Sequence, residues 1–302
     1  MYPTIRYTYQ IKNQIDSTRW EHYTPRKGDV IISTSYKSGT AWMQLIVCLL
    51  IKKDCEGLGR ISPWLEEVSQ PIDNVITRLD AQTSRRVIKT HLPLDALPYV
   101  PEVNYIVVCR DPRDVFMSLW NHYQSYTETY YQQLNQNLGP TDPPFPKCPK
   151  NIQDFWQTWI SKAWFPWENE GYPFWGNLRH TQTWWDYRHL PNIQLIHFNQ
   201  LLQEPAREIS KVADFIQVPY SPTNIAQIVE QTTFDQVRAN SDLYFTGGTQ
   251  NFKNGSKSLF HKGTNGRWRT VLSLEELEQY QHYMHKNLSP DIVRWLETGD
   301  LE

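Results

Sequence analysis

The chain has 302 residues, and its 30 Lys and Arg nearly balance 32 Asp and Glu, so a net charge of −2 argues against a broadly basic nucleic-acid-binding surface. The longest apolar run, residues 45–51, is too short for a membrane span, which needs about 20 residues, and the first residues lack the apolar core of a signal peptide. The cysteines, Cys48, Cys55, Cys109 and Cys148, have no zinc-ligand spacing, and Cys48 and Cys109 lie in apolar runs. We therefore expect reduced cysteines and a cytoplasmic protein.

Strands and helices are predicted to alternate along the chain. Short apolar, β-rich runs predict strands at residues 30–33, 86–89, 104–109 and 193–198, and helical periodicity follows at 41–52, 111–123 and 205–215. This alternation predicts an α/β fold with a central parallel sheet and helices on both faces, in a single domain over residues 1–302. The polar, proline-rich segment 127–150 is predicted to be a long surface loop.

Capping residues mark the starts of three predicted helices. Asp111 and Ser289 each precede a proline at the first helical position. Ser273 and Glu276 have the spacing of a capping box. Arg113 is expected to form an ion pair with a neighbouring acid.

The first chemical signal is the turn at residues 34–42, between a predicted strand and a predicted helix. Such a turn offers free backbone N–H groups and the positive end of the helix dipole, and Lys37, Ser38 and Thr40 add side-chain donors. The order of a Walker loop is absent because Lys37 precedes Gly39 instead of following it. The segment has the chemistry of a phosphate cradle, although an ordinary strand–helix turn would share its pattern.

Three further segments carry cationic side chains, and two of them follow predicted strands. Arg110 ends a predicted strand and Ser118 lies on the next predicted helix, where α/β sheets bind anionic ligands. Residues 253–269 carry basic residues and glycines but no acid, which is typical of an anion-binding loop. Lys89 precedes His91 by two residues, and a nearby cation favours the neutral imidazole that a general base requires.

These segments together resemble the cytosolic sulfotransferase family over residues 28–270, and the pattern near the C-terminus is more similar to bacterial members than to animal ones. The resemblance rests on the following segments: Tyr36–Trp42, Lys89–His91, Arg110–Ser118, the tandem Trp184-Trp185, and residues 261–268. It implies a P-loop-like nucleotide-binding architecture. It also implies transfer of a sulfuryl group from 3′-phosphoadenylyl sulfate to a hydroxyl or amine, leaving adenosine 3′,5′-bisphosphate and requiring no metal.

The resemblance also assigns roles to individual residues. His91 would be the general base, and Lys89 and Lys37 would stabilise the transferring sulfuryl group and the leaving phosphate. The remaining donor contacts would be Ser38, Gly39, Thr40 and Ala41 at the 5′-phosphosulfate, Arg110, Ser118, Lys262 and Gly263 at the 3′-phosphate, and Trp42, Phe234 and Thr232 at the adenine.

Three positions depart from the family pattern. Tyr36 replaces the proline of the loop, a change expected to alter only the stiffness of the loop. Phe198 stands where a tyrosine contacts the adenine, so a phenol hydrogen bond is lost. His261 stands where an arginine helps to bind the 3′-phosphate.

Two other functions remain open from the sequence. One is a P-loop kinase or NTPase, which the placement of the lysine disfavours; the other is a non-catalytic carbohydrate-binding protein, which would not need Lys89, His91 and Arg110. The acceptor is open among a phenol, a lipid alcohol, a polyketide hydroxyl and an amine, as is the oligomeric state. We expect the N-terminal segment and residues 61–80, 127–150 and 244–252 to form the acceptor site.

Overall fold

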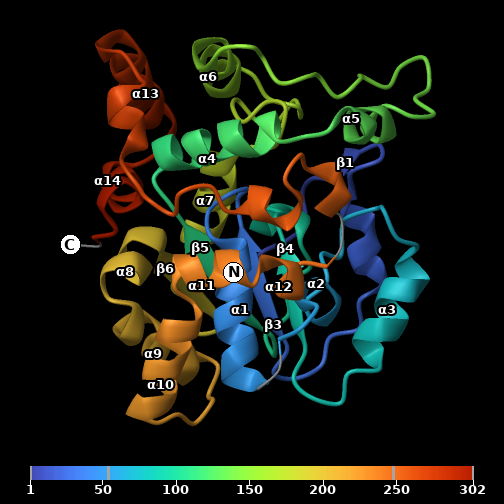
Figure 1. Cartoon of the computed structure of the whole chain (residues 1–302), viewed down its shortest axis with the longest axis vertical. Helices are drawn as coiled ribbons and strands as arrows, with labels where there is room; N and C mark the ends of the chain where they lie inside the picture. The colour runs from blue at the N-terminus through green and yellow to red at the C-terminus, as the bar shows by residue number, and fades with distance from the viewer. Residues whose placement is uncertain (1, 53–54, 247–248, 301–302) are drawn as a thin grey trace.

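A four-stranded parallel sheet forms the centre of the computed structural model, which describes residues 2–52, 55–246 and 249–300. The strands are β3 (Val30–Thr34), β4 (Val87–Thr90), β5 (Asn104–Cys109) and β6 (Ile193–His197), in the spatial order β4-β3-β5-β6 (Figure 1). Each neighbouring pair is parallel. The predicted strands and their parallel arrangement are confirmed.

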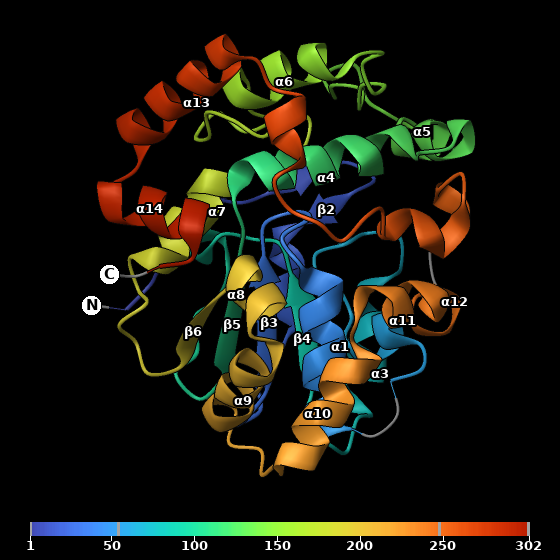
Figure 2. The ribbon, with the colours of Figure 1, turned by 60° about the vertical axis from the view of Figure 1, so that its left-hand side comes forward.

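Helices cover both faces of the sheet because successive strand residues point to opposite sides. On β3, Val30 and Ile32 pack with helices α1 (Thr40–Ile51), α9 (Pro205–Phe215) and α10 (Pro222–Gln231), which lie on one face in Figure 2. Ile31 instead faces the larger cluster, to which α4 (Pro112–Gln124) and α7 (Asn177–Trp185) contribute. The sheet is therefore buried on both sides, which explains its continuous apolar strands.

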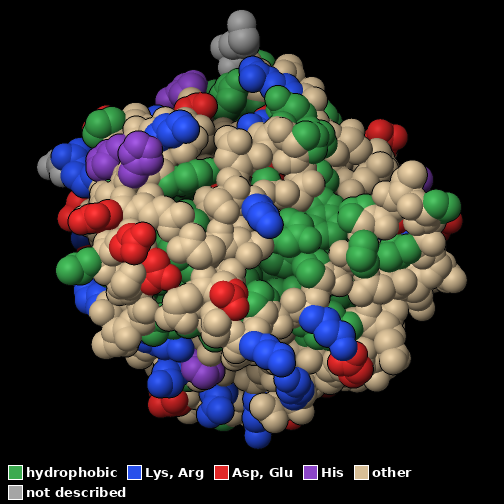
Figure 3. All heavy atoms as spheres, turned by 90° about the horizontal axis from the view of Figure 1, so that it is seen from above, with side chains coloured by type: hydrophobic (Ala, Val, Ile, Leu, Met, Phe, Trp, Pro, Cys, Tyr) green, Lys and Arg blue, Asp and Glu red, His purple; other side chains and the backbone are tan. Residues whose placement is uncertain are grey.

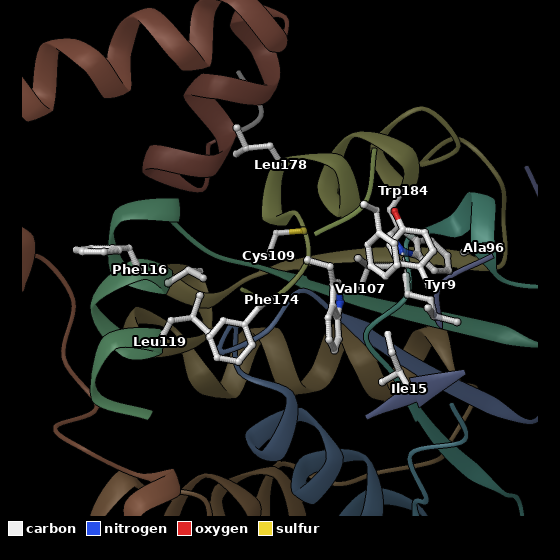
Figure 4. Close-up of a cluster of buried hydrophobic side chains, with 14 of the residues drawn as sticks. Tyr9, Ile15, Ala96, Val107, Cys109, Phe116, Leu119, Phe174, Leu178 and Trp184 are labelled. Carbon is white, nitrogen blue, oxygen red and sulfur yellow. Dashed lines mark hydrogen bonds between the residues drawn. The ribbon is translucent and has the colours of Figure 1, made fainter. Parts of the chain in front are cut away.

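Aromatic side chains fill much of the larger cluster. Figure 4 shows Val107 and Cys109 of β5 beside Phe116 from α4 and Trp184 from α7. The Trp184 ring centroid lies 5.5 Å from that of Tyr105. Most tryptophans of the described residues are buried and thus serve as packing residues.

The remaining strands and α-helices surround the sheet and the helices named above. They are β1 (Gln10–Ile11), β2 (Ile15–Asp16), α2 (Leu58–Ile61), α3 (Ile72–Asp80), α5 (Glu128–Leu134), α6 (Ile152–Ser161), α8 (Phe198–Gln203), α11 (Phe234–Ala239), α12 (Ser241–Tyr244), α13 (Leu274–Asn287) and α14 (Pro290–Thr298). Figure 3 looks down on the end of the molecule formed by α4, α5, α6 and α13, where apolar side chains gather in the middle of the face.

The three predicted helix starts are confirmed, although the Ser289 side chain makes no capping hydrogen bond. The side chain of Asp111 accepts a hydrogen bond from the backbone of Arg113, and its carboxylate pairs with the Arg113 guanidinium at 2.8 Å. Ser273 and Glu276 form the expected capping box at the start of α13. Helix α14 begins directly after Ser289, with a proline in its first turn.

Segment 127–150 is not entirely a loop, in contrast to the prediction. Its first part forms α5, where the Thr127 side chain caps the helix by accepting from the backbone N–H of Tyr130. Tyr131 and Leu134, three residues apart, bury one face of this short helix. Because most residues of the segment are polar, its helical periodicity was not detected in the sequence.

The expectation of four reduced cysteines is wrong for two of them. Cys48 on α1 is buried, as expected of a core residue, but it forms a disulfide with Cys55. Cys109 and Cys148 are free thiols. Disulfides are typical of oxidising compartments, so the cytoplasmic location stays a prediction. No helix in the described ranges is long and apolar enough to cross a membrane.

Candidate active site

A cavity of about 1320 Å³ opens at the edge where β3, β4 and β5 end. In parallel α/β sheets ligands bind outside this edge, because the loops after the strands converge there. The sequence-predicted residues that line the cavity are Lys37, Gly39, Thr40, Ala41, Trp42, Lys89, His91, Arg110, Ser118, Phe198, Thr232, Phe234, His261, Lys262 and Gly263. The four segments expected at the acceptor end contribute lining residues as well.

Ser38 is the predicted residue that does not line the cavity. Its side chain is fully buried, and its hydroxyl lies 2.7 Å from that of Ser35. The Ser38 hydroxyl therefore bonds within the turn and not into the cavity, and the donor contact expected of Ser38 stays a prediction.

The turn before α1 depends on left-handed backbone conformations. Lys37 has a φ of 64° and Gly39 a φ of 111°, a region that glycine enters without strain. A Cβ at Gly39 would also lie 2.9 Å from the Phe198 ring. Thr40 then starts the helix, with its hydroxyl 2.5 Å from that of Thr34. The positive end of α1 is thereby directed to the cavity.

Three cations in the cavity bond to neutral partners. The guanidinium of Arg110, 7% exposed, donates to the side-chain oxygen of Asn265 and to the carbonyl of Lys37. The Lys37 ammonium donates to the Leu259 carbonyl at 3.2 Å, and that of Lys89 lies 4.5 Å from the Trp64 ring centroid. The pKa of each lysine is lowered to about 8, mainly by burial; Arg110 and Lys89 contribute to the lowering at Lys37, whereas Glu66 and Glu67 oppose it at Lys89. An anion entering here would compensate all three charges.

His91 is held as a neutral imidazole with one nitrogen available. Its Nδ1 donates to the carbonyl of Thr34 at 2.8 Å, so the lone pair of the neutral ring is on Nε2. Burial and then Lys89 hold the pKa of His91 well below its usual range. The backbone N–H of His91 donates to buried Glu66 at 2.7 Å, which fixes the loop. This geometry suits a general base.

At one end of the cavity, aromatic rings pack closely against a glycine and an arginine. A Cβ on Gly263 would overlap the Phe234 ring, so only glycine fits there. The Arg110 guanidinium lies 4.1 Å from the Phe198 ring centroid, and Phe198 also contacts Trp42, with centroids 5.5 Å apart. Phe198 thus supports the arginine through packing although it lacks a phenol group.

A comparison with known families decides the identity of the chain. Residues 27–290 match the family of sulfotransferase domains. This chain is a sulfotransferase.

Curated relatives cover nearly all of this sulfotransferase. A glycolipid sulfotransferase of Mycobacterium bovis is 30% identical over 301 residues, covering 94% of this chain and 92% of that protein. Human sulfotransferase 1E1 is 24% identical, covering 91% of this chain and 88% of that protein. The greater similarity to a bacterial relative agrees with the resemblance seen in the sequence.

Solved structures share the fold of this sulfotransferase. A retinol dehydratase in complex with androsterone and the inactive cofactor PAP superposes with a TM-score of 0.69 at 20% identity, covering 91% of this chain and 87% of that one. A mouse sulfotransferase complexed with PAP gives a TM-score of 0.67 at 17% identity, covering 93% and 92%. At this identity the likeness shows the fold.

Sequence reasoning missed the aromatic rings that surround His91 in this sulfotransferase. The ring centroid of Tyr36 lies 4.5 Å from that of His91, and that of Trp64 lies 4.9 Å away. Trp175 donates its indole N–H to the carbonyl of His91 at 2.9 Å. Tyr36 therefore does more than alter loop stiffness: it forms part of the cavity wall. Its position directly before Lys37 is the signal that could have indicated this.

Binding of adenosine 3′,5′-bisphosphate should weaken as the pH rises from about 6 to about 8, around the ordinary histidine pKa of about 6.5. In the free sulfotransferase partial burial, then Arg267 and Lys262, lower the pKa of exposed His261. A dianion nearby would raise that pKa, so binding would take up a proton and lose affinity as His261 deprotonates. Calorimetric titrations across this pH range measure the effect.

The variants His261→Ala and His261→Arg serve as controls, because each removes the titrating imidazole. Both should flatten the dependence, leaving the titration of the phosphate itself, whose second pKa is about 6. Identical pH profiles for the wild type and His261→Ala would mean that the imidazole takes no part in binding.

Proposed function

We propose that this sulfotransferase transfers a sulfuryl group from 3′-phosphoadenylyl sulfate to a hydroxyl of a small-molecule or lipid acceptor, with His91 as the general base. The observation that carries the proposal is the set of three cations with neutral partners, Arg110, Lys37 and Lys89, beside a neutral imidazole. PAP, the product that such a donor would leave, is bound in two of the structures that share this fold.

The lining residues fit the two charged ends of the donor. The turn of Lys37 and the start of α1 would bind the 5′-phosphosulfate. Arg110 and Ser118, with Lys262 and the backbone of Gly263, would bind the 3′-phosphate. The adenine would lie between the rings of Trp42 and Phe234, with buried Thr232 beside it; the Thr232 hydroxyl already donates to the Ile228 carbonyl at 2.7 Å, so that residue would contribute packing.

The bound donor supplies a sulfuryl group whose bond to the phosphate oxygen breaks as the acceptor oxygen bonds to sulfur. Nε2 of His91 would take the proton of the acceptor hydroxyl. Lys37 would stabilise the charge that develops on the leaving phosphate, and Lys89 that on the transferring group. Charge on the ligand would raise the pKa of both lysines and so keep them protonated.

The comparisons do not narrow the acceptor to one chemical class. One relative is named a glycolipid sulfotransferase, and one structure of the same fold contains androsterone. A kinase would bind its nucleotide at the same kind of turn but would need Mg²⁺ for phosphoryl transfer. Across the described part of the chain, no group of three or more His, Cys, Asp or Glu gathers as a metal site. Turnover of radiolabelled donor in EDTA tests the proposal that no metal is required.

Adenosine 3′,5′-bisphosphate should stabilise the protein far more than AMP or ATP, because these two lack the 3′-phosphate that Arg110 and Lys262 would bind. A ligand specific for the folded state adds about 2.7 kcal/mol at 100 times its dissociation constant. Melting temperatures measured with each nucleotide test this result.

A matched pair of variants sharpens the test. Lys262→Ala should reduce the shift, whereas Lys257→Ala, an exposed lysine in the same loop that does not line the cavity, should not. Equal shifts for AMP and the bisphosphate would contradict the donor assignment.

A further inference from the structure

A second histidine, His122, lies in the wall of the cavity that contains His91. It is on α4 one turn after Ser118, and both residues line the cavity. Only 7% of His122 is exposed, and among the described residues its buried Nδ1 has no hydrogen-bond partner. Burial, and then the charges of Lys37 and Lys89, hold its pKa well below the usual range. His122 is therefore a neutral imidazole with one donor and one acceptor nitrogen.

The surroundings of His122 are aromatic and supply no polar partner for that nitrogen. Its ring centroid lies 5.2 Å from that of Tyr126, 5.1 Å from that of Phe252 and 6.3 Å from that of Tyr36. Leaving a buried polar atom unpaired costs about 1–3 kcal/mol. Nδ1 is enclosed by the protein, whereas Nε2 is not, so a polar group of a ligand in the cavity would pair with Nε2.

Beyond this aromatic wall the cavity is rich in amide side chains. They come from segments far apart in the sequence: Gln14, Gln70, Gln133, Gln136, Gln250 and Asn251. Each primary amide carries both donors and acceptors, as a hydroxyl does. Gln70, Gln133, Gln136 and Gln250 are exposed, so water pairs with them in the free protein, and the Gln70 side chain also accepts from Arg78. A ligand with many hydroxyls would replace that water with direct hydrogen bonds, whereas a monohydric phenol or sterol offers a single hydroxyl for this purpose.

We propose that the acceptor is a polyol of the sugar class, in which one hydroxyl reacts at His91 and a neighbouring hydroxyl bonds to the imidazole of His122. Tyr36 and Trp64 offer flat apolar faces to the carbon face of the ring, and the amide groups bind the outer hydroxyls. This inference rests on the proposed sulfuryl transfer and narrows its acceptor.

The test compares two acceptors that share an alkyl chain, octyl β-D-glucoside and octan-1-ol, with radiolabelled 3′-phosphoadenylyl sulfate as the donor. The wild type should have a kcat/KM at least tenfold higher for the glucoside. His122→Phe keeps an aromatic ring in the wall but removes both nitrogens. It should lower the glucoside-to-octanol ratio of kcat/KM about three- to tenfold, the worth of one hydrogen bond, mainly through KM.

Two controls separate recognition from damage to the fold. His285→Phe replaces an exposed histidine on α13 and should leave the ratio unchanged. The melting shift with adenosine 3′,5′-bisphosphate should persist in His122→Phe, since the donor end is untouched.

A higher kcat/KM for octan-1-ol or for 4-nitrophenol than for the glucoside would overturn the proposal. So would an unchanged ratio in His122→Phe, or absence of turnover with the glucoside while the bisphosphate still stabilises the protein. Failure of the bisphosphate to stabilise the protein would instead contradict the donor site, and with it the proposed function.

Discussion

Replacement of His91 by Ala should lower turnover about 10²–10⁴-fold, the usual contribution of a positioned general base. The hydrogen bond from Nδ1 to the Thr34 carbonyl directs the lone pair of Nε2 away from the protein backbone, and no such group remains in the variant. Binding of adenosine 3′,5′-bisphosphate should be nearly unchanged, because the cations at the donor end are retained. Single-turnover transfer of labelled sulfuryl to an alcohol, with calorimetry for the nucleotide, measures both quantities.

The control is His189→Ala, which removes an exposed histidine and should leave turnover intact. Thermal melting establishes that the His91→Ala protein is folded before its rate is interpreted. Turnover near that of the wild type would show that another group accepts the proton.

Replacement of Arg86 by Ala should lower the free energy of unfolding by about 3–5 kcal/mol, as expected when one partner of a buried ion pair is removed. The Arg86 side chain is 1% exposed, lies just before β4, and pairs with Asp29, whose side chain is 2% exposed. The same guanidinium donates to the Thr24 carbonyl at 2.7 Å. In the variant the Asp29 carboxylate would stay buried with only the Tyr23 hydroxyl and a backbone N–H as donors. Unfolding by urea measures the loss.

Arg207→Ala provides the comparison, because Arg207 pairs with Glu204 on the surface, where their side chains are 65% and 53% exposed. Exposed pairs contribute about 0–1 kcal/mol. If both variants lose the same small amount, the buried pair stabilises the fold no more than a surface pair does.

The sheet was predictable because its strands are buried on both faces. Residues 30–32 and 105–109 are therefore continuous apolar runs, and each strand is followed by a turn and a periodic helix. Helix α5 escaped prediction because only Tyr131 and Leu134 turn to the core. The Cys48–Cys55 disulfide was missed because one partner lies in an apolar run that gives no sign of pairing.

The candidate site was predictable where a chemically active side chain lies at or directly after the end of a strand, as Lys89, His91 and Arg110 do. It was not predictable where a role depends on packing between distant segments. Asn265 binds the Arg110 guanidinium across 155 positions of sequence, and Glu66 receives the backbone N–H of His91 from another loop. Likewise, nothing in the sequence indicated that the Ser38 hydroxyl would bond to Ser35 within the same turn.

Helix α4 carries residues for both ends of the cavity. Ser118 and His122 line it one turn apart, about 6 Å along the helix axis. Just beyond the helix, the chain pairs with a distant segment, since Thr127 donates to Asn251 and Lys253 to Ser125 through the backbone. Backbone pairing tolerates changes of side chain, so substitutions at the outer end of α4 should leave this pairing intact and with it the spacing between that end of the cavity and Ser118.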